Sequence, residues 1–348
     1  MQMTPLGRTG LMISELCLGT MTFGTQTPEA EAHAQIDRAL AAGINIIDTA
    51  EMYPVNPLSP ETVGVTEEII GRWNAANKGR RGDYILATKH SGEGFKGARD
   101  GAPITPETIP QVIEGSLRRL QTDYIDLYQF HWPNRGSYMF RQNWRYDPSG
   151  LDRAAVLDDM EGCLAALARE VERGTIRHFG LSNETAWGTA QWLHLAEAGH
   201  GPRVAAIQNE YSLLCRMFDT DLAELSVAED VGLLAFSPLA AGLLTGKYQG
   251  DRVPEGSRMS IVPELGGRKT PRAFEAVAAY HEIAERHGLD PVQMALAWCR
   301  TRPFMASAIF GATRMEQLDH ALGSVEVTLT DEVLAEIDAA HRAHPMPY

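Results

Sequence analysis

Four polar residues with the chemistry to reduce a carbonyl group stand at or near the ends of predicted β-strands. Asp48, Lys89 and His131 close three successive apolar runs, and Tyr53 lies in the segment that follows Asp48. A nicotinamide can supply the hydride for such a reduction, but the developing alkoxide also needs a proton donor. A phenol is a weak acid at neutral pH, and an ammonium at Lys89 would lower the pKa of Tyr53. Asp48 would keep Lys89 charged, and His131 could hydrogen-bond the carbonyl oxygen.

Taken singly, each of these residues has an ordinary structural explanation. A lysine at a strand end is usually a surface charge, and a tyrosine in a loop usually serves packing. His131, beside Trp132, could be a structural histidine. Their joint placement at strand ends favours a catalytic set. No cluster of metal-ligating residues accompanies them, so we expect no metal.

Eight short apolar runs alternate with amphipathic helical segments along the chain, which predicts an α/β fold, a (β/α)₈ TIM barrel. The carboxyl ends of the strands in such a barrel form one face, where catalytic groups meet. We expect residues 1–348 to form one domain. The predicted strands are Leu16–Gly19, Ile44–Asp48, Tyr84–Lys89, Tyr124–His131, Ile176–Ser182, Ala205–Asn209, Gly232–Phe236 and Ala308–Gly311.

Helix starts are marked at Thr27 and Thr105, where a hydroxyl that could cap the helix precedes proline and glutamate. An N-terminal β-hairpin around Arg8–Gly10 should close the bottom of the barrel. Two long connections, 134–152 and 247–269, are of a length that is usually functional or mobile. The other predicted helices are Glu67–Ala76, Val156–Arg173, Thr185–Ala198, Asp219–Glu229, Asp290–Thr301 and Glu316–Gly323, with extra helices near the C-terminus at Pro271–His287 and Asp331–His341.

Composition excludes several classes of protein. The formal net charge of -14 argues against nucleic acid or an anionic membrane as the main partner. No apolar run approaches the roughly 20 residues of a membrane span, and the first ten residues carry no signal peptide. The four cysteines lie far apart, which disfavours a disulfide framework or a zinc site and favours a cytoplasmic location.

Two glycine-rich segments imitate nucleotide-binding motifs. Gly92–Gly97 has the spacing of a dinucleotide fingerprint, but a loop follows it in place of the helix that must receive the pyrophosphate. Gly242–Lys247 lacks the spacing and hydroxyl of a P-loop. His281 and His287 share a predicted helix without a zinc-protease pattern, so we expect both to be solvated.

Over nearly its whole length the sequence resembles the aldo-keto reductases, and within them most closely the bacterial Tas-like members, then potassium-channel β subunits. The motifs that carry the resemblance are Gly19–Gly24, Asp48–Tyr53, Ala87–Lys89, Asp123–Trp132, Phe179–Asn183, Gln208–Ser212, Phe236–Leu239, Leu244–Tyr248 and Gly311–Thr313. The resemblance implies a catalytic tetrad of Asp48, Tyr53, Lys89 and His131, with Tyr53 as general acid. It also implies NADPH as cofactor and a small-molecule carbonyl substrate, an aldehyde or a ketone.

By the same resemblance, Ser182, Asn183 and Gln208 would hydrogen-bond the nicotinamide carboxamide, and Phe236 would stack on the nicotinamide ring. The loop after Phe236 would fold over the pyrophosphate, and residues after the last strand would hold the 2′-phosphate and adenine. The remaining predicted cofactor residues are Gly19, Thr20, Met21, Ser237, Pro238, Leu239, Gly242, Thr245, Lys247, Gly311, Thr313, Arg314 and Gln317.

Arg314 is the expected source of a preference for NADPH over NADH, because a guanidinium at a helix N-terminus can grip a 2′-phosphate. The alternative is that Arg314 pairs with a surface acid. Two departures from the family pattern matter: Pro54 opens an insertion reaching Gly64 after the tyrosine, and His320 and Ala321 replace an acid and an asparagine that contact adenine in relatives.

The loop after His131 is aromatic and basic, and we expect it to shape the substrate pocket through Trp132, Tyr138 and Trp144. The alternative is a loop packed on the barrel wall or against another subunit of a homo-oligomer. For the whole chain, a regulatory module resembling channel β subunits and a non-redox barrel are the competing hypotheses. The intact tetrad favours the enzyme over the first, and the lack of metal ligands or paired carboxylates disfavours the second.

Overall fold

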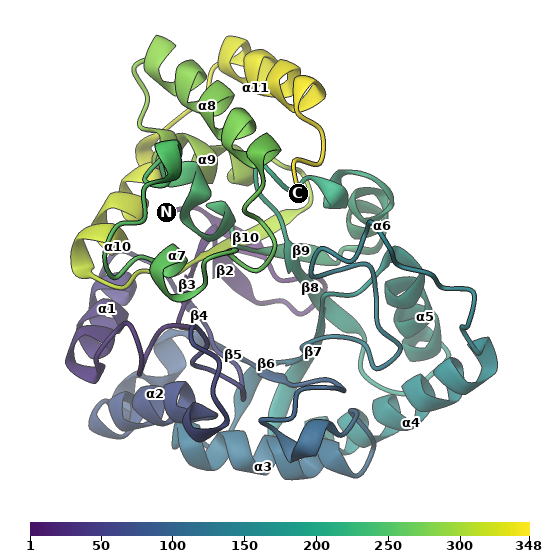
Figure 1. Ribbon diagram of the computed structural model, residues 1–348. Coiled ribbons are helices and arrows are strands. Elements are labelled where there is room, and N and C mark those ends of the chain that lie inside the picture. Colours follow the sequence, from purple (N-terminus) through teal and green to yellow (C-terminus); the bar gives the residue numbers. More distant parts are fainter.

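The computed structural model describes residues 1–348 and contains a closed barrel of eight parallel strands (Figure 1). Sequential strands are neighbours, and the last pairs with the first to close the barrel. The fold predicted from the sequence is therefore confirmed. In barrel order the strands are β3 (Leu16–Gly19), β4 (Ile46–Asp48), β5 (Ile85–His90), β6 (Ile125–Phe130), β7 (Ile176–Ser182), β8 (Val204–Glu210), β9 (Gly232–Phe236) and β10 (Met305–Phe310).

The helices form a ring around the strands, and the main hydrophobic core lies between the two layers. Between β9 and β10 the chain forms α8 and α9, and α8 packs against α11 as an addition to the eightfold pattern. The helices are α1 (Glu29–Ala41), α2 (Val65–Ala76), α3 (Thr108–Leu120), α4 (Arg153–Glu172), α5 (Ala186–Glu197), α6 (Asp221–Glu229), α7 (Arg258–Ile261), α8 (Pro271–Arg286), α9 (Pro291–Arg300), α10 (Met315–Leu322) and α11 (Asp331–Ala343).

Helix capping was predicted incorrectly at two positions. Helix α3 begins at Thr108 with Glu107 as its N-cap residue, although the Thr105 hydroxyl still accepts from the Thr108 N–H at 3.3 Å. The Thr27 side chain makes no cap hydrogen bond to α1; its hydroxyl lies 2.8 Å from the Thr22 hydroxyl in the turn before the helix. Asp152 and Asp290, by contrast, each accept two backbone N–H groups at the start of α4 and α9. A hydroxyl before a proline can satisfy the preceding turn as well as the following helix, and local sequence does not decide between them.

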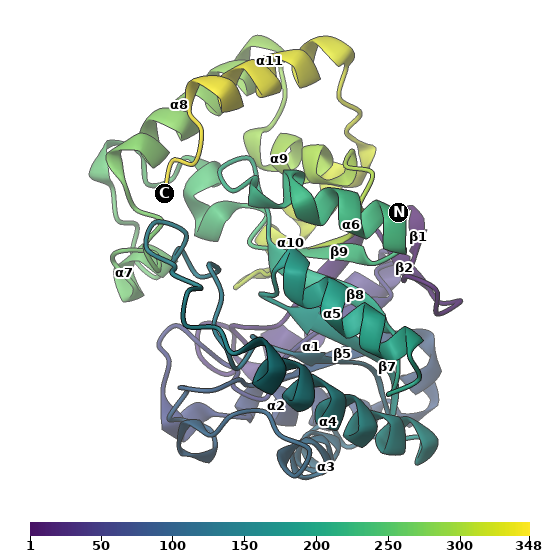
Figure 2. The ribbon, with the colours of Figure 1, turned by 90° about the vertical axis from the view of Figure 1, so that its right-hand side faces the viewer.

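The bottom of the barrel is closed by the predicted hairpin, β1 (Met3–Pro5) and β2 (Met12–Ser14), which pair as antiparallel strands. Leu6 and Ile13 are fully buried and pack inside the barrel against Leu127 and other interior side chains. Figure 2 shows the hairpin at one end of the barrel and α7, the long loops and the C-terminus at the opposite end. β10 begins at Met305, before the predicted Ala308, because Met305 already pairs with Leu233 of β9; Ser307 Oγ also donates to the Ser14 carbonyl oxygen of the hairpin.

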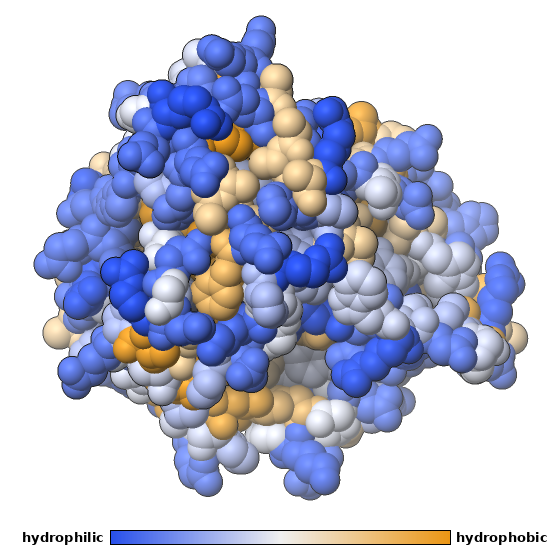
Figure 3. All heavy atoms as spheres, turned by 45° about the horizontal axis from the view of Figure 1, so that its top comes forward, coloured by the Kyte–Doolittle hydropathy of each residue, from blue (hydrophilic) through white to orange (hydrophobic).

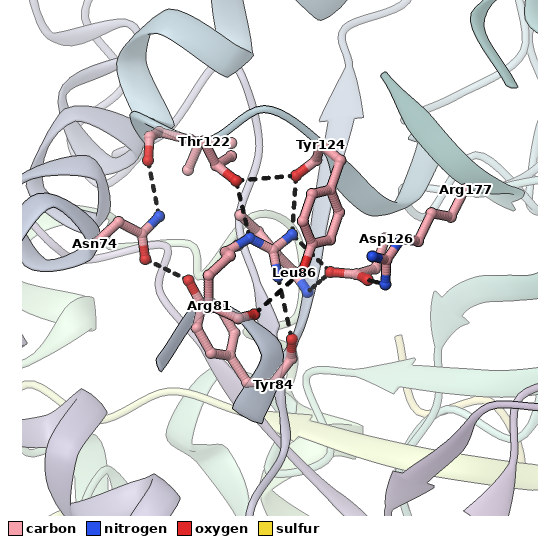
Figure 4. A network of polar contacts seen from close by, with 9 residues as sticks. Asn74, Arg81, Tyr84, Leu86, Thr122, Tyr124, Asp126 and Arg177 are labelled. Atoms are coloured by element: carbon pink, nitrogen blue, oxygen red, sulfur yellow. Dashed lines mark hydrogen bonds and ion pairs between the residues drawn. The ribbon is translucent and has the colours of Figure 1, made fainter. Parts of the chain in front are cut away.

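A buried carboxylate ties three strands together near the same end. Asp126, at the start of β6, accepts from Arg81 at 2.7 Å, from Arg177 of β7 at 2.9 Å and from the Leu86 N–H of β5 at 3.0 Å (Figure 4). Because both oxygens of the carboxylate accept hydrogen bonds, this network ties the starts of the three strands together.

The surface is predominantly hydrophilic in the view of Figure 3, where hydrophobic residues form small, separate groups. The structure contains no helix with both the length and the apolar character needed to cross a membrane.

Candidate active site at the barrel mouth

A buried ion pair lies at the carboxyl ends of two neighbouring strands. Lys89 Nζ of β5 lies 2.6 Å from Asp48 Oδ2 of β4 and 2.7 Å from the Thr49 carbonyl oxygen. Both side chains are buried, and Lys89 is inaccessible to solvent. Burial lowers the pKa of Lys89, but the Asp48 carboxylate more than offsets it, so the net pKa is raised and the lysine is an ammonium.

Tyr53 lies over this pair. Lys89 Nζ is 5.0 Å from the centroid of the Tyr53 ring, and the ring meets the His131 imidazole edge-on at 5.8 Å between centroids. The Tyr53 carbonyl accepts hydrogen bonds from the backbone N–H groups of Gly64 and Thr66, so the start of α2 fixes the tyrosine. The two ends of the insertion between Pro54 and Gly64 are therefore held together by the Gly64–Tyr53 hydrogen bond.

Two opposing effects set the pKa of Tyr53. Burial raises the pKa above the ordinary value of a tyrosine, and the Lys89 ammonium opposes this rise without reversing it. The predicted direction of the Lys89 effect agrees with the structure, but the larger effect of burial leaves the net pKa raised. Sequence reasoning omitted the desolvation of the phenol by the walls of the mouth.

His131 directly follows β6 and is neutral. Burial, with a further contribution from the Lys89 ammonium, holds its pKa well below the usual value for histidine. Nδ1 is buried without a hydrogen-bond partner, while the backbone carbonyl of His131 accepts from Asn183 Nδ2 at 2.9 Å. A neutral imidazole can donate one hydrogen bond from one ring nitrogen to a ligand oxygen.

The predicted carboxamide-binding residues surround the same point. Gln208 Nε2 of β8 donates to Asp48 Oδ1 at 2.7 Å, and Asn183 Nδ2 also lies 3.1 Å from Ser182 Oγ. Asn183 Oδ1 is buried and has no partner. An unpaired buried acceptor beside His131 fits a ligand that carries an N–H donor, which a nicotinamide carboxamide does.

The predicted residues Gly19, Thr20 and Met21 lie at the carboxyl end of β3. A side chain at Gly19 would collide with Ile309 of β10, which lies 2.9 Å from the position of a Cβ atom. Thr20 Oγ1 donates to the Asp48 carbonyl at 2.8 Å, and the Met21 carbonyl accepts from the Val55 N–H. These contacts tie β3 to the strand and loop that carry Asp48 and Tyr53.

The segment after β9 turns repeatedly through the left-handed region. Positive φ angles occur at Ser237, Ala240, Ala241, Gly242 and Gly246. Successive residues of this kind turn backbone N–H groups toward one side, as anion-binding loops do. The stretch 236–247 runs from the end of β9 through a 3₁₀ turn over 240–245, and it contains the predicted residues Phe236, Ser237, Pro238, Leu239, Gly242, Thr245 and Lys247.

Side chains brace this turn. Thr245 Oγ1 donates to the Gly242 carbonyl at 2.8 Å, and Lys247 Nζ lies 5.1 Å from the centroid of the Tyr248 ring. His281 of α8 lies 2.9 Å from the Leu244 carbonyl oxygen, so the expectation of a solvated His281 was wrong. The reason is that α8, an addition to the barrel, packs on this turn.

After β10, Gly311 and Thr313 lead into α10. Gln317 Oε1 accepts from both the N–H and the hydroxyl of Thr313, at 2.9 and 3.1 Å. Arg314 is the N-cap residue and is exposed, and its side chain forms neither an ion pair nor a hydrogen bond. The surface acid that the alternative required is thus not its partner in this structure.

The two residues of α10 that depart from the family pattern lie in different surroundings. His320 Nε2 lies 3.0 Å from Asp290 Oδ1, and Ala321 is buried in the core. His320 is therefore engaged by the start of α9, and Ala321 faces the protein interior. The His320 side chain nevertheless remains 46% exposed.

The three predicted substrate residues lie in different surroundings. Trp132 packs on His131 with 5.0 Å between ring centroids and donates to the Glu93 carbonyl. Tyr138 is largely buried and packs edge-on against Tyr146, and burial raises the pKa of Tyr138 to about 12. Trp144 is 63% exposed and lines a separate depression with Arg272. Only Trp132 directly contacts a member of the predicted tetrad.

Sequence reasoning missed Arg258 of α7. Its Nε is buried without a partner, and its charge acts on Tyr53 across the mouth. Burial, assisted by the nearby Arg268, lowers the pKa of Arg258 to about 10. An arginine in a four-residue helix within a long loop has no sequence signal, because only the folded loop places it over the barrel.

A model of the aldo/keto reductase family matches residues 15–342. The chain belongs to the aldo/keto reductase family. Protein tas of Escherichia coli is 46% identical over 350 aligned residues, which cover 100% of this chain and 99% of that protein. An uncharacterized oxidoreductase of Bacillus subtilis, YrpG, is 33% identical, with 96% and 94% covered. A probable voltage-gated potassium channel subunit beta of Oryza sativa is 30% identical, with 99% and 98% covered.

Aldo/keto reductases use nicotinamide cofactors, and this family member is accordingly a nicotinamide-dependent oxidoreductase. Three features of this aldo/keto reductase fit such a cofactor. They are the unpaired Asn183 Oδ1, the left-handed turn after β9 and the free Arg314 at the start of α10.

Proposed function

We propose that this aldo/keto reductase uses NADPH to reduce an aldehyde or ketone to an alcohol, with Tyr53 as the proton donor. The observation that carries the proposal is the stack of Asp48, Lys89 and Tyr53 at the barrel mouth, with Lys89 Nζ 2.6 Å from Asp48 Oδ2 and 5.0 Å from the Tyr53 ring centroid. A bound nicotinamide supplies the hydride. The residues of the chain supply the proton and the polarisation of the carbonyl.

The proton comes from the Tyr53 hydroxyl. A raised pKa keeps this hydroxyl protonated at neutral pH, as a proton donor must be. As the proton leaves, the Lys89 ammonium stabilises the phenolate that forms, and Asp48 keeps the ammonium aimed. Because Lys89 is inaccessible to solvent, this stabilisation is weakly screened.

His131 polarises the substrate carbonyl. Its neutral ring can donate a hydrogen bond to the oxygen without competing with Tyr53 as the acid. The edge-on contact with Tyr53 places both rings on the same side of the mouth. One carbonyl oxygen can then receive a hydrogen bond from each.

The preference for NADPH is assigned to Arg314. Its guanidinium is exposed, unpaired and at the N-terminus of α10, where the helix dipole also favours anions. Arg258 adds a second unpaired cation over the mouth. Thr313, Gln317 and the turn over 240–245 would hold the remaining phosphate and adenosine groups.

A substrate pocket next to Trp132, roofed by the loop after β6, completes the proposal. We also propose that 1–348 acts as one domain, because α11 packs on α8 and the C-terminal Tyr348 returns to the mouth. The cysteines are all unpaired, which supports a reducing compartment such as the cytoplasm.

A panel of aldehydes and ketones, assayed by NADPH oxidation at 340 nm, tests the function. The proposal expects turnover of at least one carbonyl class, with the matching alcohol as product. NADPH that binds to the protein but is not oxidised by any aldehyde or ketone in the panel would refute the assignment and favour a regulatory role.

A further inference from the structure

One buried carboxylate at the end of β8 contacts both long loops of the barrel mouth and the C-terminal residue. Glu210 Oε1 accepts from Arg268 Nε at 2.7 Å and from the Tyr348 hydroxyl at 3.1 Å, and Glu210 Oε2 accepts from Arg141 at 2.8 Å. Arg141 belongs to the loop after β6 and Arg268 to the segment after α7. Three segments remote in sequence therefore meet on one side chain.

The backbone next to both arginines adopts the left-handed conformation, which is unfavourable for residues other than glycine. Phe140 and Arg141 have φ angles of 55° and 63°, and Leu265 has a φ of 47° just before two left-handed glycines and Arg268. Non-glycine residues adopt this region only when surrounding contacts compensate. On each loop, an arginine at or just after the strained residues forms an ion pair with Glu210, and this ion pair can compensate for the strain.

The charges make Glu210 indispensable to this arrangement. Arg141 and Arg268 are both largely buried, and Arg258 adds a third positive charge nearby. Glu210 is the carboxylate that pairs with Arg141 and Arg268. Without it, buried cations would face one another with no counter-charge, which is strongly unfavourable.

Each loop also leads to the proposed catalytic groups. Phe140 packs edge-on against Trp132 at 6.0 Å, and Trp132 in turn packs on His131. The other loop carries α7, whose Arg258 acts on Tyr53. The position of the first loop therefore affects the surroundings of His131, and the position of the second affects the surroundings of Tyr53.

We infer that Glu210 is a positioning residue, a latch that holds the loop over 134–152 and the loop over 247–269 closed over the barrel mouth. Both of its carboxylate oxygens are occupied by protein donors. Its effect on ligands rests on the proposed function, whereas its effect on the loops does not. Loss of the latch should raise the KM for the carbonyl substrate and the rate of NADPH release, while kcat at saturation changes little.

Asp126 supplies a matched control. It is also a buried carboxylate shared by two arginines, but it lies at the opposite end of the barrel (Figure 4). Glu210→Gln and Asp126→Asn should both lower the melting temperature. Only Glu210→Gln should loosen the mouth.

The experiment is hydrogen–deuterium exchange of the ligand-free protein, with NADPH release followed by stopped-flow fluorescence. Glu210→Gln should speed exchange in both loops about tenfold or more, since breaking a buried pair costs several factors of ten in the local closing equilibrium. Arg141→Gln should loosen chiefly 134–152, and Arg268→Gln chiefly 247–269. These single-arm variants still report on the latch if Glu210→Gln fails to fold.

Unchanged exchange in both loops of Glu210→Gln, or the same mouth pattern in Asp126→Asn, would overturn the inference. So would Arg141→Gln and Arg268→Gln variants that leave their own loops as protected as in the wild type. Because exchange needs no turnover, these results stay readable if the protein reduces no carbonyl compound.

Discussion

Lys89 Nζ lies 5.0 Å from the centroid of the Tyr53 ring, and Lys89 has no access to solvent. The Lys89 ammonium faces the Tyr53 ring and is at the same time paired with the Asp48 carboxylate. This geometry allows Lys89 to favour the phenolate without itself giving up a proton. It also means that the chemistry of Tyr53 can be removed without disturbing the ion pair beneath it.

Tyr53→Phe should keep NADPH binding and lose carbonyl reduction by about a hundredfold or more, the usual size of a general-acid contribution. Measuring kcat/KM together with the NADPH dissociation constant separates the loss of catalysis from any loss of cofactor binding. Tyr128→Phe serves as the control, because Tyr128 is also buried but packs against His90, and its hydroxyl has no hydrogen-bond partner to lose. Turnover retained by Tyr53→Phe would remove the tyrosine from the reaction.

Arg314→Ala should weaken NADPH binding by roughly ten- to a hundredfold, the range expected for a lost charge-assisted hydrogen bond. NADH binding should hardly change, because NADH lacks the 2′-phosphate. Dissociation constants for both cofactors, measured by fluorescence titration, test this. Arg118→Ala, at another exposed arginine without an ion pair, should leave both constants unchanged. Parallel weakening of both cofactors by Arg314→Ala would contradict the assignment.

Shortening the loop after β6 within 143–150 should change the ratio of kcat/KM between a bulky and a small aldehyde by roughly tenfold, as pocket contacts typically do. Asn134 and Arg135, which anchor the start of the loop to Ile104 and Glu184, stay in place. The NADPH dissociation constant should not move. An equal loss for all substrates and for the cofactor would show that the loop is structural.

Stability should fall as the pH drops below about 6.5, because buried histidines stay neutral in the fold while they gain protons in the unfolded chain. Burial holds the pKa of His90 well below its usual value, and its two ring nitrogens have no partners. Since the unfolded chain then binds more protons, His90 should contribute a loss of up to about 1.4 kcal/mol between pH 7.5 and 5.5.

His90→Phe tests this, because a phenyl ring fits among Tyr128 and Phe130 and carries no titratable group. Urea denaturation at pH 5.5 and 7.5 should show a smaller difference in the free energy of unfolding than the wild type. An identical pH difference in the two proteins would mean that His90 binds the same number of protons in the folded and unfolded states, so that the fold does not lower its pKa.

The sequence by itself determined the barrel and the positions of the chemical groups at its mouth. Asp48, Lys89 and His131 could be placed together because each ends or follows an apolar run, and parallel strands bring their carboxyl ends to one face. The hairpin before β3 was equally predictable from its turn residues. These features can be recognised in short segments of sequence, and the repeated strand–helix pattern of the barrel then brings the strand ends to one face.

Only the tertiary structure decided how those groups behave and what holds the roof over them. The pKa of Tyr53 depends on desolvation by segments far away in the chain, and the exposure of Trp144 depends on the path of its loop. The meeting of Arg141 and Arg268 at Glu210 joins residues whose separation in sequence leaves no local pattern. Burial and the pairing of charges are sums over the folded surroundings, and no window of sequence contains those surroundings.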